Sequence, residues 1–118
     1  MKKINSKSYE SELYDIHAEM CKVFSHPKRL ELINVLRAGE CNVGKLAGKL
    51  GVTVGNLSQH LTMMKQRQML ITRKEGNVVY YRLTNPKILK AFDLIQEILI
   101  EQMERSGTLL KRAKWMTK

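Results

Sequence analysis

The chain is poor in cysteine and has no long apolar segment. Its two cysteines, Cys21 and Cys41, are too few for the disulfide framework of a small secreted protein. No apolar run approaches the roughly 20 residues that span a bilayer. The basic start of the chain, residues 1–8, also lacks the apolar core of a signal peptide. We therefore expect a cytoplasmic protein with no membrane partner.

Acidic residues are also scarce, above all in the middle of the chain. Lys and Arg number 21 against 11 Asp and Glu, which gives a net charge of +10. Residues 41–74 contain no Asp or Glu, yet they carry Lys45, Lys49, Lys65, Arg67, Arg73 and Lys74. Because a carboxylate would oppose contact with phosphate, this segment favours a nucleic-acid partner. A solvated basic face is the alternative.

Length and composition are those of one globular domain. A chain of 118 residues with 43% hydrophobic residues can bury a modest core. We expect a single domain over 1–118, with its core at about 9–105 and a basic tail at 107–118. Apolar residues at steps of three and four predict helices at about 9–24, 27–38, 43–50, 54–66 and 86–105.

Capping residues and turns separate these elements. Ser25 is expected to cap the second helix and Thr53 the fourth, while Gly51 ends the third. Branched and aromatic residues at 70–74 and 78–83 predict two strands, and Glu75-Gly76-Asn77 between them predicts a turn. The two strands together form a β-hairpin.

The fourth helix has an unusual outward face. Leu57, Leu61 and Met64 recur at steps of four and three and are expected in the core. The opposite face is polar but uncharged, with Gly55, Gln59, Thr62 and Gln66. A merely solvated face would more often carry Glu and Lys, which are better helix formers. This face is therefore a candidate for recognising a partner.

The order of elements predicts the fold. Two helices joined by the tight turn at 51–53 form a helix-turn-helix signal, in which the second helix enters the DNA major groove. The hairpin that follows makes this a winged helix. We expect a mainly α fold with a two-stranded β-hairpin wing and long terminal helices that form a dimer interface, because the apolar stripe of the last helix is broader than a small domain needs.

The chain resembles the ArsR/SmtB-type winged-helix repressors. The motifs that carry the resemblance are Phe24-Ser-His-Pro-Lys-Arg-Leu-Glu-Leu-Ile33, Val43-Gly-Lys-Leu46, Leu57-Ser-Gln-His-Leu61 and Val79-Tyr-Tyr-Arg-Leu83. The resemblance covers roughly residues 20–100. It implies a homodimer that binds an imperfect palindrome in double-stranded DNA and represses transcription until an effector, a metal ion or a thiol-reactive species, releases it. Some members of the family have no known effector.

The resemblance and the charge pattern together predict a DNA-binding set. Gln59 is the candidate base reader, because its amide can pair with adenine N6 and N7. Ser58 and His60 are candidates for phosphate or positioning contacts, and a buttress for the turn is the alternative for His60. The whole predicted set is Lys45, Thr53, Asn56, Ser58, Gln59, His60, Thr62, Lys65, Arg73, Lys74 and Asn77.

The metal and thiol sites typical of the family are not reproduced. Thiol-rich members carry Cys-Val-Cys at the start of the third helix, where this chain has Asn42-Val43-Gly44. Other members bind zinc or nickel through Asp and His of the last helix, and this last helix has Asp93, Glu97 and Glu101 but no His. The last-helix acids fit a solvated stripe, and no confident cofactor is predicted.

A weaker arrangement remains open. His17 and Cys21 are four residues apart and share a helix face. If Cys41 approached them, in the same chain or across a dimer, the three could bind zinc or a soft metal ion. Alternatively, Cys21 and Cys41 could form a redox switch. The alternative to both is that each cysteine is a small buried hydrophobe.

Three classes of function compete. The sequence favours a DNA-binding regulator, with an effector-independent regulator as one alternative. An RNA-binding or protein-binding winged helix is another, but RNA readers expose stacking aromatics, and Tyr80, Tyr81 and Trp115 form no such platform. An enzyme has no support, because the sequence shows no nucleophile–base pair, phosphate loop or paired acids.

Overall fold

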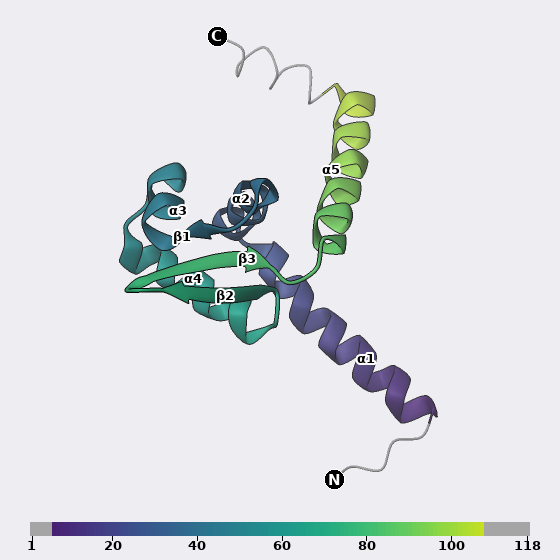
Figure 1. Ribbon diagram of the computed structural model, residues 1–118. Helices are drawn as coiled ribbons and strands as arrows, with labels where there is room; N and C mark the ends of the chain where they lie inside the picture. The colour runs from purple at the N-terminus through teal and green to yellow at the C-terminus, as the bar shows by residue number, and fades with distance from the viewer. Residues whose placement is uncertain (1–5, 108–118) are drawn as a thin grey trace. The chain divides into compact units, whose positions relative to one another are not determined.

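The computed structural model describes residues 6–107, with side chains from residue 8 onward (Figure 1). The chain divides into two compact units, Met1–Asn85 and Pro86–Lys118. Apart from Gly107, the basic tail expected at 107–118 lies outside the described residues.

The first unit begins with α1 (Ser6–Cys21) and a 3₁₀ turn at Lys22–Ser25, followed by α2 (Pro27–Val35). The prediction that Ser25 caps α2 is wrong. Ser25 belongs to the 3₁₀ turn, where its Oγ donates to the Cys21 carbonyl at 3.2 Å. His26 has the extended backbone that a capping position needs, and its Nδ1 accepts from the Lys28 N–H at 3.1 Å. Pro27 occupies the first turn as expected.

The helix-turn-helix follows the predicted bounds closely. α3 spans Val43–Leu50 and α4 spans Val54–Gln66. Gly51 ends α3 with a φ of +66°, a left-handed conformation that glycine adopts without a Cβ penalty. Thr53 caps α4, because its hydroxyl accepts from the Asn56 N–H at 3.1 Å. These local signals set where α3 ends and where α4 begins.

The wing belongs to a three-stranded sheet rather than a two-stranded hairpin. β2 (Leu70–Glu75) and β3 (Val78–Leu83) pair antiparallel around Gly76 and Asn77. A short strand that the sequence did not predict, β1 (Cys41–Asn42), pairs with the other edge of β3, opposite Tyr81 and Tyr80. Because β1 leads directly into α3, it ties the helix-turn-helix to the wing.

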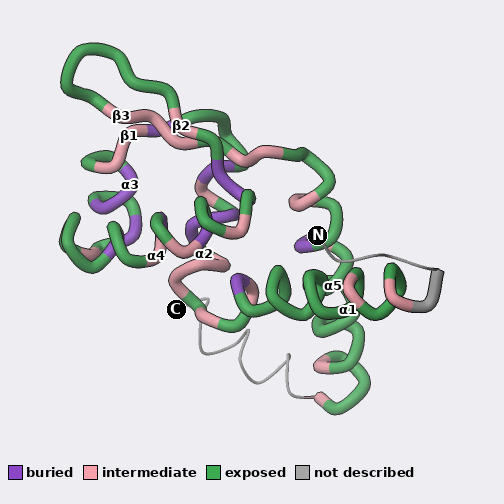
Figure 2. The backbone as a smooth tube through the Cα atoms, turned by 90° about the horizontal axis from the view of Figure 1, so that it is seen from below, coloured by how far each residue is buried: buried purple, intermediate pink, exposed green. Residues whose placement is uncertain are grey.

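The core of this unit lies beneath the helix-turn-helix. Figure 2 shows buried segments gathered on α2, α3 and α4 and at the start of β2. Leu57, Leu61 and Met64 are all buried, as predicted. The apolar face of α4 therefore packs into the core, and its polar face is exposed to solvent. The fully buried large side chains are Val23, Leu32, Ile33, Leu46, Leu57, Leu61, Met64 and Met69.

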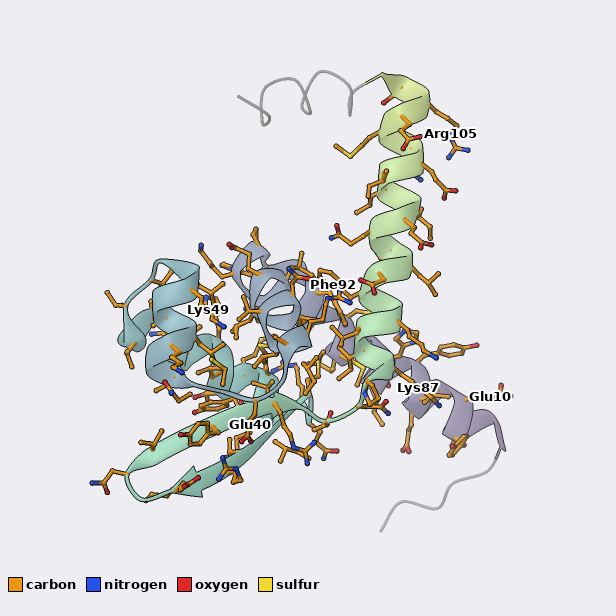
Figure 3. All side chains as sticks on the ribbon, turned by 45° about the horizontal axis from the view of Figure 1, so that its top comes forward. Glu10, Glu40, Lys49, Lys87, Phe92 and Arg105 are labelled. Atoms are coloured by element: carbon orange, nitrogen blue, oxygen red, sulfur yellow. The ribbon has the colours of Figure 1, made fainter. Side chains whose placement is uncertain are left out.

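The second unit contains α5 (Lys87–Ser106), the last expected helix. Figure 3 labels Lys87, at the start of this helix, and Arg105, in its last turn. Both α5 and α1 leave large apolar side chains exposed: Leu94, Ile95, Ile98, Leu99 and Ile100 on α5, and Tyr9, Leu13, Tyr14, Ile16 and Met20 on α1. Among the described residues, no helix is both long enough and apolar enough to cross a membrane.

Candidate DNA interface

The exposed face of α4 presents the polar side chains that the sequence predicts. Thr53, Asn56, Ser58, Gln59, Thr62 and Lys65 are all exposed. Two of them are engaged with the helix itself: Thr53 caps it, and the Ser58 Oγ donates to the Val54 carbonyl at 2.8 Å. The Gln59 side chain makes no hydrogen bond to any described residue, so its amide is available to a base edge.

The basic side chains of the wing are not equivalent. Lys74 and Asn77 are exposed near the tip of the hairpin, and Lys45 is exposed on α3. Arg73 is bound within the protein. Its Nε lies 3.2 Å from both Glu40 oxygens, its Nη1 lies 2.6 Å from the Glu75 carboxylate, and its guanidinium packs over the Tyr80 ring.

Arg73 and Glu40 stabilise each other in their charged forms, and Glu75 also stabilises the charged form of Arg73. The hydrogen bonds that Arg73 donates to Glu40 and Glu75 raise the pKa of Arg73, and the one that Glu40 accepts lowers the pKa of Glu40. Glu40, labelled in Figure 3, precedes β1, and Glu75 ends β2. The two acids are the residues on either side of the acid-free segment 41–74. Sequence reasoning missed them because it considered the segment and not its flanks.

His60 joins α4 to α2. Its Nδ1 lies 3.3 Å from Arg29 Nη1, and its ring packs against the His26 ring with the centroids 4.6 Å apart. Partial burial lowers the pKa of His60, and the nearby His26 and Arg29 lower it further. The contacts give His60 a role in supporting α4, which was the alternative prediction for it.

A cleft opens beside the first turn of α4. It has a volume of about 450 Å³. The lining residues are His26, Lys28, Gly51, Val52, Thr53, Asn56 and His60. No carboxylate is among them, so the cleft suits an anion. His26 and Lys28 entered the sequence analysis only as part of the motif at 24–33 and were not placed in the DNA-binding set.

The proposed cysteine and histidine cluster does not form within one chain. Cys21 is exposed at the end of α1, whereas Cys41 is buried in β1, where it pairs with Tyr81. Among the described residues, no group of three or more His, Cys, Asp or Glu side chains could hold a metal ion. His17, Cys21 and Cys41 therefore do not fit a metal site within a single protomer.

The comparisons with known proteins match this architecture. The family model described as "Bacterial regulatory protein, arsR family" matches residues 26–69. The biofilm growth-associated repressor of Xylella fastidiosa is 32% identical over 89 residues, which cover 75% of this chain and 78% of that protein. The chain belongs to the arsR family of bacterial regulatory proteins. The nodulation protein NolR of Rhizobium meliloti is 31% identical over 84 residues, covering 71% of this chain and 69% of that protein.

Solved structures confirm the fold of this arsR-family chain. The crystal structure of NolR from Sinorhizobium fredii has a TM-score of 0.69 at 28% identity and covers 83% of this chain and 96% of that one. The homodimeric winged helix-turn-helix DNA-binding domain Mb0332 from Mycobacterium bovis has a TM-score of 0.76 at 26% identity. The match covers 89% of this chain and 95% of that one. The predicted winged helix and the predicted class, a DNA-binding transcriptional regulator, are confirmed.

Proposed function

We propose that this arsR-family protein is a homodimeric repressor that binds an imperfect palindromic DNA operator in the bacterial cytoplasm, with residues 1–118 acting as one domain. The observation that carries the proposal is the exposed, polar and uncharged face of α4. Three buried side chains on the opposite face hold α4 in place, and the segment that contains the helix, residues 41–74, has no carboxylate. In that geometry Gln59 contacts a base edge, and Asn56, Ser58 and Thr62 contact the same groove.

The dimer is the part of the proposal that the exposed apolar residues support. α1 and α5 each leave apolar side chains in water, which a partner protomer would cover. The Mycobacterium bovis relative is described as homodimeric. Two copies of α4 related by a two-fold axis would read two half-sites, so the operator would be palindromic.

The effector is proposed only as a class, either a metal ion or a thiol-reactive species. The antimony-specific repressor AntR is among the similar structures, with a TM-score of 0.65 at 27% identity. In this chain a zinc or soft-metal site would need ligands from both protomers, because the described residues of one protomer do not assemble them. For a thiol-reactive effector, Cys21 is the reachable thiol, because Cys41 is buried. An effector-independent regulator is the alternative.

The role of α4 is tested by two substitutions with different expected signatures. Gln59→Ala removes a base contact, so affinity for the operator should fall about tenfold while affinity for unrelated duplexes stays unchanged. Lys65→Ala removes a phosphate contact, so affinity for all duplexes should fall alike and the salt slope should decrease by about 1. Fluorescence anisotropy against both duplexes over a range of salt concentrations measures both effects.

Unchanged operator binding by Gln59→Ala would show that α4 does not read bases through this residue. A loss confined to the operator in Lys65→Ala would contradict its assignment to the phosphate backbone.

A further inference from the structure

Two histidines at the cleft are held in one tautomer. The Nδ1 of His26 accepts the Lys28 backbone N–H at 3.1 Å, so this nitrogen carries no proton. The Nδ1 of His60 lies 3.3 Å from Arg29 Nη1. A guanidinium has donors but no acceptor, so His60 Nδ1 must accept as well. Each ring is therefore neutral and carries its proton on Nε2.

Arg29 is fixed in the position that imposes this tautomer on His60. Its Nε donates to the Val23 carbonyl at 3.0 Å and its Nη2 to the Lys22 carbonyl at 2.9 Å. All three hydrogen bonds of the guanidinium thus lie within the protein, and they connect the 3₁₀ turn after α1 to α4. The lowered pKa of His60 agrees with a neutral ring at this position.

The two Nε2–H donors are left for a ligand. Neither His26 nor His60 uses Nε2 for a hydrogen bond to any described residue, and both side chains line the same cleft. Their rings pack at 4.6 Å with a tilt of 56°. Because both side chains line this cleft, their N–H groups are open to a hydrogen-bond acceptor from outside the chain.

The lining of the cleft fits a singly charged anion with several oxygens. Lys28 is its one lining cation, and the Lys28 ammonium also contacts the Leu50 carbonyl at 3.3 Å and the Glu31 carboxylate at 3.1 Å. Two neutral N–H donors and one shared cation match a phosphodiester, which offers two unesterified oxygens for one negative charge.

We propose that His26 and His60 together bind one backbone phosphate of the DNA through their Nε2–H groups, with Arg29 as the positioning residue that fixes the His60 tautomer. The proposal rests on the proposed function and deepens it, because it adds α2 to the DNA-binding surface. It also explains how a half-buried histidine can both support α4 and contact DNA.

Two substitutions of His60 distinguish the loss of its Nε2–H donor from the loss of its structural contact with Arg29. His60→Asn keeps an acceptor near the position of Nδ1 and removes the Nε2–H donor. His60→Gln places an amide N–H near the position of Nε2 and removes the acceptor for Arg29. We expect His60→Asn to lower affinity about tenfold for operator and unrelated duplex alike, and His60→Gln to restore most of it. The matched control is His17→Asn on α1, which should bind like the wild type.

A neutral phosphate analogue locates the contact. One methylphosphonate is placed in turn at each backbone position of the operator, and affinity is measured for wild type, His26→Asn and His60→Asn. One position should weaken wild type about tenfold while costing either variant less than about twofold, since both variants already lack a donor. Melting temperatures of the variants check that each is folded.

Three results would overturn the proposal: wild-type affinity in His60→Asn, an equal loss in His60→Gln and His60→Asn, or no methylphosphonate position that couples to the histidines. A fourth is independent of DNA, namely ¹⁵N spectra of the free protein that place the proton of either ring on Nδ1. If wild type preferred no sequence, the proposed function would fail instead, and the comparison of His60→Asn with His60→Gln on any bound duplex would still decide the histidine contact.

Discussion

At the scale of single residues, two carboxylates determine what the wing arginine can do. Glu40 and Glu75 bind Arg73, so this side chain reaches a phosphate only by exchanging those partners. Lys74, next in the strand, is exposed. Of the two neighbouring cations predicted to contact phosphate, Lys74 is therefore the better placed in the free protein.

Removing the Glu40 charge should leave Arg73 held by Glu75 alone, which makes it easier for a phosphate to displace the remaining partner, and should strengthen DNA binding. We expect Glu40→Gln to raise affinity for all duplexes about threefold, with the gain shrinking as salt increases, because the less tightly held cation contributes a phosphate contact. Titrations at low and high salt measure this. Glu97→Gln on α5 changes the net charge equally, so an identical gain in that variant would show that only overall charge matters.

The pKa of His60 predicts how stability changes with pH. The pKa is lowered in the folded chain, while an unfolded histidine titrates near about 6.5. The unfolded state therefore binds more protons in the window just below about pH 6.5, and stability falls as pH drops through it. Urea unfolding at pH 7.5, 6.5 and 5.5 should show this loss in wild type and a smaller loss in His60→Asn. Equal losses in both proteins would contradict the assignment.

At the scale of elements, the best-predicted parts are those with local signals. The bounds of α3 were predicted from residues that act within a few positions, including Gly51, and Thr53 marked the start of α4 in the same way. β1 is two residues long and too short for any alternation, so only its pairing with β3 defines it. The cap of α2 was misplaced by one residue because Ser25 is a common cap and His26 a rare one.

The α4 cap gives a stability prediction at this scale. Thr53→Ala leaves the Asn56 N–H without its side-chain partner and should lower the free energy of unfolding by about 1 kcal/mol. Thr62→Ala, an exposed substitution within the same helix, is the matched control and should change it by less than about 0.5 kcal/mol. Chemical denaturation of both variants measures the difference, and equal effects would mean that the Thr53 hydroxyl does not stabilise the helix start.

At the scale of the whole molecule, the sequence predicted the kind of partner better than the details of the site. The net charge, the acid-free segment and the order of elements all indicated DNA. The contacts of Arg73 with Glu40 and of His60 with Arg29 join residues 33 and 31 positions apart. Such pairs follow from tertiary packing, which no local pattern specifies. The same holds for the failed cysteine cluster, since burial of Cys41 depends on β1 pairing.

The central claim is that this chain is a dimeric, sequence-specific DNA-binding regulator. Selection of bound duplexes from a random library, with the reduced protein, tests it most directly. The account predicts a recovered palindrome whose half-sites lie about one helical turn apart, as two copies of α4 require. Recovery of salt-sensitive binding without any shared motif would contradict the account, and the basic surface would then serve a partner recognised by charge alone.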